Sequence, residues 1–206
     1  MKLLKTDDIF IKEGAISDMV CGRLISYFEG QVGRKISGDE YSASFGSLNA
    51  LKNRSLDSEF TSNSLRHGEI LIVDHARAKF ELKSVYDVIE KSLQEFGSQH
   101  PGLGSLLEED FEITKPRIEK LPKSGGFTWH MDSRQSLGDR RFLTWIIYLN
   151  DVFNGGEIEF LRQGLRVSPR RGLLLMFSPF WTHVHQGRPP ASSAKYTLSS
   201  GVCLTN

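Results

Sequence analysis

The stretch Phe127-Thr128-Trp129-His130-Met131-Asp132 decides how the second half of this 206-residue chain is interpreted. It is a short run of aromatic and β-favouring residues, which predicts a strand. Residues two positions apart in a strand point to the same face. His130 and Asp132 can therefore direct an imidazole nitrogen and a carboxylate oxygen to one point. Alone, such a pair is more often an ordinary surface pair than a metal site.

A third ligand would have to come from a distant strand, and Thr182-His183-Val184-His185-Gln186 offers two candidates. Two histidines and one carboxylate on one face of a metal are typical of non-haem Fe(II) oxygenases. His183 and His185 share a face by strand alternation, so alternation cannot choose between them. Two histidines on one strand also suit a zinc site. The plain alternative is a pair of hydrogen-bonded, partly buried histidines.

Lys195 is a further candidate, because it lies at the start of an apolar strand. Burying an ammonium group requires a partner, and a dicarboxylate cosubstrate would supply one. The alternative is an edge-strand lysine that faces water. Thr144 and Tyr148 share one face of another predicted strand. Each could add a hydroxyl group to the same carboxylate.

From about Phe111 onward, short β runs are separated by turn residues, which suggests a jelly roll or barrel. The turns contain glycine, proline and asparagine, as in Asn154-Gly155-Gly156. The predicted strands are Phe111–Glu119, Phe127–Met131, Phe142–Leu149, Glu157–Leu161, Leu165–Val167, Leu173–Phe177, Thr182–Gln186 and Tyr196–Cys203.

The first half carries two helix signals. Ser17 is a candidate cap for a helix that stops at Gly30, and the pair Ser84 and Asp87 resembles a capping box before a helix that ends at Gly97. Residues 37–68 are rich in Ser, Asn and Gly and are expected to form loops, and residues 67–80 one or two strands. We therefore predict one domain over 1–206, mainly β. Residues 1–110 would be helix-rich support, and 111–206 a double-stranded β-helix (jelly roll) core.

The composition is that of an ordinary globular protein, with 39% hydrophobic and 25% charged residues and a formal net charge of +1. A whole-chain attraction to nucleic acid is therefore not expected. No apolar run approaches membrane-spanning length, and the start of the chain does not look like a signal peptide. Cys21 and Cys203 show no disulfide framework. We expect a cytoplasmic protein with reduced thiols and no membrane partner, and its oligomeric state stays open.

Residues from about Lys120 to Cys203 carry an ordered series of short motifs, each weak alone. The series resembles the prolyl 4-hydroxylase-like branch of the Fe(II)/2-oxoglutarate dioxygenases. Its members are Gly125-Gly126-Phe127, His130-x-Asp132, Arg141-x-x-Thr144, Tyr148-Leu149-Asn150, Gly155-Gly156-Glu157, Phe160, Val167-x-Pro169-x-x-Gly172, Phe177, His185-Gln186-Gly187 and Lys195.

The resemblance implies a role for each matching residue. His130, Asp132 and His185 match the iron ligands. The family spacing selects His185 over His183, because a basic residue follows the last ligand by about ten positions. Lys195 matches that basic residue, which pairs with the distal carboxylate of 2-oxoglutarate. Tyr148 matches a tyrosine that contacts this carboxylate, and Thr144 is expected to help.

One position departs from the family pattern. Many relatives carry a tyrosine nine or ten residues before the first histidine ligand, where it touches the cosubstrate. Leu121 and Lys120 hold these positions here. The missing hydroxyl predicts a cosubstrate pocket that is more apolar on this side.

The resemblance implies an Fe(II)-, 2-oxoglutarate- and O2-dependent hydroxylase that releases succinate and CO2, with ascorbate as an optional addition. The leading substrate is a prolyl residue in a peptide or protein, and a free amino acid or other small molecule is the rival. A nucleic-acid demethylase is disfavoured, because that group typically has arginines in the final strand. From other classes, a non-catalytic jelly-roll binding protein would need an incomplete triad. A zinc hydrolase would need an H-E-x-x-H helix, which the chain lacks.

Overall fold

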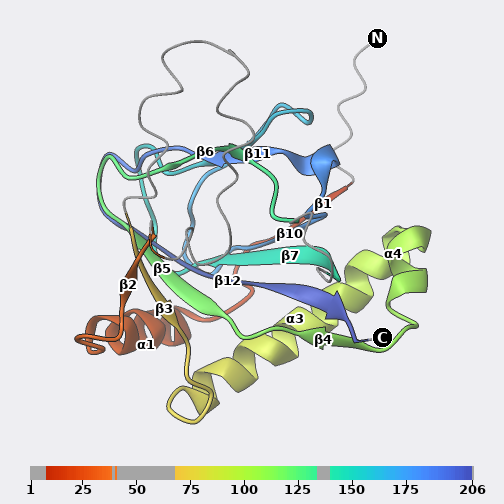
Figure 1. Cartoon of the computed structure of the whole chain (residues 1–206), viewed down its shortest axis with the longest axis horizontal. Helices are drawn as coiled ribbons and strands as arrows, with labels where there is room; N and C mark the ends of the chain where they lie inside the picture. The colour runs from red at the N-terminus through yellow and green to blue at the C-terminus, as the bar shows by residue number, and fades with distance from the viewer. Residues whose placement is uncertain (1–7, 39, 41–67, 134–139, 206) are drawn as a thin grey trace.

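A computed structural model describes residues 8–38, 40, 68–133 and 140–205. They form two β-sheets that face each other, with helices on the outer side of the larger sheet (Figure 1). The mainly β jelly-roll architecture predicted from the sequence is confirmed. The loops predicted over 37–68 lie almost entirely outside the described residues.

The large sheet contains eight strands, and every pairing in it is antiparallel. They are β1 (Ile9–Lys12), β2 (Ile36–Ser37), β3 (Glu69–Ile72), β4 (Phe111–Ile113), β5 (Arg117–Leu121), β7 (Arg141–Tyr148), β10 (Leu174–Phe177) and β12 (Lys195–Leu204). Their order is β1-β10-β7-β12-β5-β3-β2, with β4 paired to the far end of β12. The long strands β7 and β12 therefore lie at the centre of the sheet.

The small sheet holds four antiparallel strands, which are β6 (Phe127–His130), β8 (Ile158–Phe160), β9 (Leu165–Val167) and β11 (His185–Gly187). Their order is β6-β11-β8-β9. Figure 1 shows β6 and β11 on one side of the large sheet. A short 3-10 helix, η2 (Trp181–His183), leads into β11.

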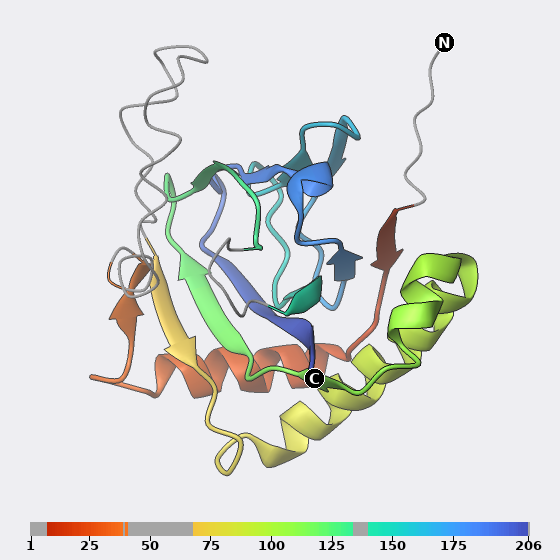
Figure 2. The same ribbon diagram turned by 45° about the vertical axis from the view of Figure 1, so that its right-hand side comes forward.

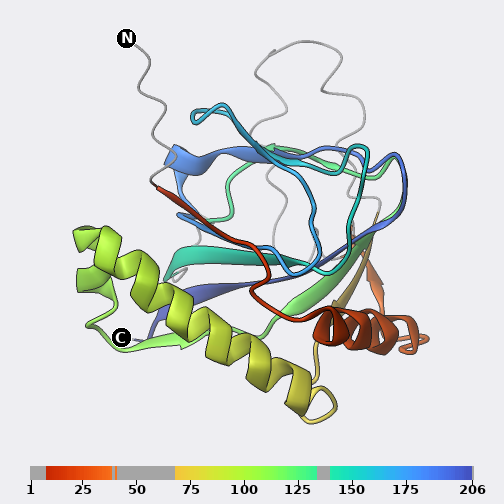
Figure 3. The same ribbon diagram turned by 180° about the vertical axis from the view of Figure 1, so that it is seen from behind.

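The helices are α1 (Asp18–Glu29), α3 (Lys79–Gln99) and α4 (Pro101–Leu106). Figures 2 and 3 show α1 and α3 on the face of the large sheet that is turned away from the small sheet. This is the bracing role expected from their apolar stripes.

Local sequence explains where α1 begins and ends. The Ser17 side chain accepts a hydrogen bond from Val20 N at 3.3 Å, and Gly30 follows the last turn. The predicted cap is thus confirmed. In α3 the predicted capping box is wrong, because the helix begins five residues before Ser84. Buried Leu82 extends the apolar stripe toward the N-terminus, and packing outweighs the local cap signal.

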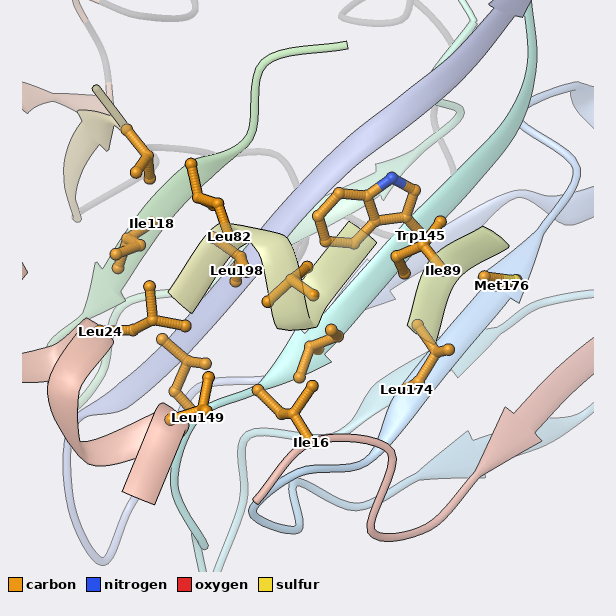
Figure 4. Close-up of a cluster of buried hydrophobic side chains, with 14 of the residues drawn as sticks. Ile16, Leu24, Leu82, Ile89, Ile118, Trp145, Leu149, Leu174, Met176 and Leu198 are labelled. Carbon is orange, nitrogen blue, oxygen red and sulfur yellow. The ribbon is translucent and has the colours of Figure 1, made fainter. Parts of the chain in front are cut away.

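Alternation along β7 separates two cores. Trp145 and Ile147 are fully buried against the helices, in a cluster that Figure 4 shows with Leu24, Leu82 and Ile89. The intervening residues Thr144, Ile146 and Tyr148 point to the space between the sheets. A smaller apolar cluster fills one end of this space, around Tyr148, Phe160, Leu175 and Phe177.

Two expectations about strands need correction. The first half is not only support, because β1, β2 and β3 all join the large sheet. The strand predicted over Phe111–Glu119 is two strands, β4 and β5, which pair with different stretches of β12. Pro116 lies in the break, where its missing N–H cannot contribute to a ladder. That the chain is one domain over 1–206 stays a prediction.

Two further observations concern the described residues. No helix among them is long and apolar enough to cross a membrane. Cys21 is buried and Cys203 is partly buried, and burial raises the pKa of Cys21 to about 11. A thiol with so high a pKa stays protonated and unreactive at neutral pH.

Candidate metal centre

The two histidines of the candidate triad face each other across the pair β6–β11. His130 is the register partner of His185, and their ring centroids are 4.4 Å apart. Asp132 follows β6 by two residues, so it returns to the same side as His130. The resulting Nε2–Oδ1 distances to Asp132 are 3.6 Å from His130 and 3.9 Å from His185.

Main-chain carbonyls fix how both imidazoles are turned. His130 Nδ1 lies 2.8 Å from the oxygen of Thr128, and His185 Nδ1 lies 2.9 Å from the oxygen of His183. A carbonyl oxygen only accepts, so each Nδ1 carries the proton and donates it. Each Nε2 then keeps a free lone pair directed at Asp132. This is the tautomer that a metal ligand needs.

The charge states also suit a divalent metal. Burial, followed by the neighbouring His130, lowers the pKa of His185 to about 4, so this imidazole is neutral at pH 7. Burial alone would raise the pKa of Asp132, but His185, His130 and then Arg141 hold it well below its usual range. A neutral imidazole at His185 and an ionised carboxylate at Asp132 are the forms that bind metal without releasing a proton.

Within the described parts of the chain, His130, Asp132 and His185 are the one group of three potential metal ligands. Their ligand atoms all lie within 4.8 Å of one another. The set is two nitrogens and one carboxylate oxygen on one side of a point, which suits an octahedral Fe(II) with positions left open. The donor set therefore fits the metal that the sequence implied.

His183 and His185 do not lie on one strand, which corrects the sequence interpretation. The segment predicted as one strand over Thr182–Gln186 is η2 followed by β11, so the alternation argument does not apply. The His183 ring lies between the Thr182 hydroxyl, 2.9 Å away, and the oxygen of Asp8, 3.1 Å away. Burial lowers its pKa. Its main-chain oxygen, rather than its ring, contacts His185.

A cavity opens between the triad and the inward face of the large sheet. The triad lines one wall. The opposite wall carries polar side chains of β5, β7 and β12, which are Arg117, Glu119, Thr144, Lys195, Thr197 and Ser199. The structure thus brings Thr144 and Lys195 to the cavity that the metal ligands also line.

Lys195 is buried, with 2% of its surface exposed, and its Nζ donates to the oxygen of Gly156 at 2.8 Å. Burial lowers its pKa to about 8, against the opposing charges of Glu119 and Glu157. Thr144 Oγ1 is also buried and has no hydrogen-bond partner among the described residues. A buried hydroxyl without a partner costs free energy, so it marks a place where a ligand atom would be stabilised.

Tyr148 lies elsewhere. It is fully buried in the smaller apolar cluster and does not line the cavity, and its hydroxyl donates to the oxygen of Val167 at 3.2 Å. Burial raises its pKa far above the ordinary tyrosine value. The structure therefore does not bring Tyr148 to the cavity with Thr144 and Lys195.

Apart from Lys195, the polar residues of β5 and β12 in the cavity wall were not predicted from the sequence. Arg117 and Glu119 alternate with buried Ile118 on β5, and Thr197 and Ser199 follow Lys195 at strand spacing. Strand alternation from Lys195 predicts that Thr197 and Ser199 point to the same face. Leu121 pairs with Lys195 in register and is almost fully buried, but it is not among the residues that line the cavity. A more apolar cosubstrate pocket on this side therefore stays a prediction.

A family model described as the 2OG-Fe(II) oxygenase superfamily matches residues 117–200. This segment of the chain is therefore similar to that superfamily. All six site residues singled out from the sequence lie inside the matched segment. No curated protein matches the chain.

Solved structures share the fold of this chain over nearly its whole length. A viral collagen prolyl hydroxylase from Paramecium bursaria Chlorella virus-1, solved with 2OG, is 16% identical with a TM-score of 0.64 and covers 99% of this chain and 100% of its own. A Trichoplax adhaerens prolyl hydroxylase, in complex with a hypoxia inducible factor peptide fragment, is 19% identical with a TM-score of 0.66. The match covers 97% of this chain and 85% of that chain. A Pseudomonas putida prolyl-4-hydroxylase is 16% identical with a TM-score of 0.56, and the match covers 98% of this chain and 96% of that chain.

Proposed function

We propose that this protein is an Fe(II)- and 2-oxoglutarate-dependent dioxygenase that hydroxylates an unactivated C–H bond, with release of succinate and CO2. The observation that carries the proposal is the His130, Asp132 and His185 triad, with both Nδ1 atoms committed to main-chain oxygens. This arrangement pre-orients three ligands and leaves the cavity side of the metal open.

His130, Asp132 and His185 would hold the iron through two Nε2 atoms and one carboxylate. When bound, iron would allow O2 to act as the oxidant, with 2-oxoglutarate as the co-reductant, and so supply chemistry that the side chains of the protein lack. The cavity wall would position the cosubstrate. Lys195 offers a buried ammonium for its distal carboxylate, and Thr144 offers a hydroxyl that has no partner among the described residues.

The chain also shields the centre. Phe160 and Phe177 pack against the His185 ring, with centroid distances of 5.6 Å and 4.8 Å. These rings are fully buried, so they keep water from the back of the ligand. An apolar backing of this kind also holds the imidazole in place and limits side reactions with water.

The leading substrate in this proposal is a prolyl residue of a peptide or protein. It is supported by the sequence resemblance and by the prolyl hydroxylases among the structures that share the fold. A free amino acid is the rival substrate. The ligand set argues against a non-catalytic jelly roll, because no member of the triad is missing.

A turnover assay tests the proposal. The protein, loaded anaerobically with Fe(II), is given 2-oxoglutarate, oxygen and either proline-containing peptides or free amino acids. We expect succinate to form, and a peptide to gain one oxygen atom on a prolyl ring by mass spectrometry. Oxygen gain on a free amino acid alone would replace the peptide assignment. Absence of succinate under every condition would refute the oxygenase assignment.

A further inference from the structure

Glu119 is a buried carboxylate in the cavity wall for which the proposed function has no use. It is 3% exposed and lies on the inward face of β5, beside the cavity that the metal ligands also line. Carboxylates are rarely this buried, because losing hydration is costly. A charge inside a binding cavity acts strongly on any charged ligand there, since little water screens it.

Strand register places Glu119 next to the proposed cosubstrate anchor. Glu119 pairs with Thr197 on β12, and Lys195 is the next inward residue along that strand. Such diagonal neighbours have side chains within about 8 Å of each other. Glu119 is also the strongest charge that opposes the effect of burial on the pKa of Lys195. Register and electrostatics therefore agree that Glu119 is close to Lys195.

A second acid near Lys195 changes what the pocket prefers. A distal carboxylate placed on Lys195 would also lie close to the carboxylate of Glu119, and like charges at short range in a buried site are unfavourable. Arg117, the other charged residue on this face of β5, pairs with Ser199, one inward position further from Lys195.

We propose, building on the proposed function, that Glu119 is a selectivity residue of the cosubstrate pocket. Its carboxylate repels the distal carboxylate of 2-oxoglutarate. The repulsion weakens binding of this diacid relative to 2-oxo acids whose distal group is uncharged. The pocket therefore discriminates less between diacids and neutral 2-oxo acids than a pocket with Lys195 and without Glu119 would.

The test is a titration of 2-oxoglutarate into the anaerobic iron complexes of wild type and Glu119→Gln. Binding is measured by calorimetry and by the visible charge-transfer band. It is done at about pH 6.5, where Lys195 is charged in the wild type. Removing one buried negative charge at this range should tighten 2-oxoglutarate binding on the order of tenfold. Affinity for 2-oxopentanoate, which lacks the distal carboxylate, should stay within about twofold.

Glu157→Gln is the matched control. Glu157 also acts on Lys195 electrostatically, but it does not line the cavity and lies 3.8 Å from Arg188 Nε. If Glu119 acted only by keeping Lys195 charged, the two variants would change 2-oxoglutarate affinity in the same direction. We expect Glu157→Gln to leave the affinity nearly unchanged.

Unchanged or weaker 2-oxoglutarate binding by a folded, iron-binding Glu119→Gln would overturn the inference, as would an equal gain for 2-oxopentanoate. If neither wild type nor variant bound any 2-oxo acid, the proposed function itself would fail. The two failures are thus distinct.

A second measurement needs no variant. In the wild type, the 5-amide of 2-oxoglutarate replaces the distal carboxylate by a neutral group of similar size. With Glu119 present, the amide should bind within about tenfold of the diacid. A diacid preference of roughly a thousandfold would show that Lys195 acts unopposed, and would contradict the role given to Glu119.

Discussion

His185 Nδ1 donates to the main-chain oxygen of His183 at 2.9 Å, so the backbone of His183 orients the imidazole of the proposed ligand His185. The His183 ring is held on the other side by Thr182 and the oxygen of Asp8. The two histidines therefore have different tasks.

Substitution of each histidine should separate these tasks. His185→Ala removes an Nε2 ligand, and iron binding should be lost in an anaerobic equilibrium titration. His183→Asn keeps the main-chain oxygen, so iron binding should stay within about tenfold of wild type while turnover falls. Circular dichroism of both variants controls for folding. Loss of iron in His183→Asn with retention in His185→Ala would reverse the assignment.

Lys195 makes folding stability depend on pH. Its folded pKa of about 8 lies below the ordinary value of 10.5, so the unfolded chain binds the proton more tightly than the folded chain. The free energy of unfolding should therefore rise as pH increases from about 8 to about 10.5, relative to Lys195→Met. Urea unfolding of both proteins across this window measures the difference. Parallel curves would indicate that Lys195 is not buried as described.

The same residue should link cosubstrate binding to pH. An ammonium at Lys195 is needed to pair with a carboxylate, so 2-oxoglutarate affinity should decline as pH rises above about 8. Lys195→Met should bind the diacid weakly at every pH and lose this decline. Calorimetric titrations of 2-oxoglutarate into both proteins at a series of pH values would check this. A wild-type affinity that rises with pH would contradict it.

Tyr148 provides a test of the family match against the geometry. Because its hydroxyl donates to the oxygen of Val167 outside the cavity, Tyr148→Phe should cost about 1 kcal/mol of stability and leave 2-oxoglutarate affinity almost unchanged. Thermal unfolding and calorimetry give the two numbers. A tenfold loss of affinity with little loss of stability would mean that Tyr148 turns to the cosubstrate when it binds.

Thr144 should behave in the opposite way. Its buried Oγ1 has no hydrogen-bond partner among the described residues, so replacing it by the isosteric Val should not destabilise the empty protein. The affinity for 2-oxoglutarate should fall about three- to tenfold, since one hydrogen bond to a charged group is lost. Thr144→Ser, which keeps the hydroxyl, should bind like wild type. Equal affinities for Val and Ser would remove Thr144 from the site.

The sequence predicted the strands of the second half well, because short β runs there are bounded by Gly, Pro and Asn turns. The Ser17 cap was equally visible, since it depends on neighbours along the chain. The strands of the first half were harder to recognise. β1 is four residues long and pairs with β10, more than 160 positions away. Only long-range pairing reveals such a strand.

The site residues divide in the same way, into those that local sequence predicts and those that depend on tertiary contacts. His130 and Asp132 could be paired from alternation, because both lie in or next to one strand. Choosing His185 over His183 could not rest on alternation, since the 3-10 turn at Trp181–His183 has no clear sequence signal. Tyr148 matched by spacing, yet the hydrogen bond of its hydroxyl to Val167 is a tertiary contact. Glu119 was overlooked because an acid in a strand usually faces water.

An anaerobic titration of the wild-type protein with Fe(II) and then 2-oxoglutarate tests the central claim most directly. We predict one iron per chain held by His130, Asp132 and His185, and a weak visible charge-transfer band that grows with 2-oxoglutarate and is absent in His185→Ala. A protein that binds no iron, or that binds iron and shows no band at saturating 2-oxoglutarate, would contradict the account.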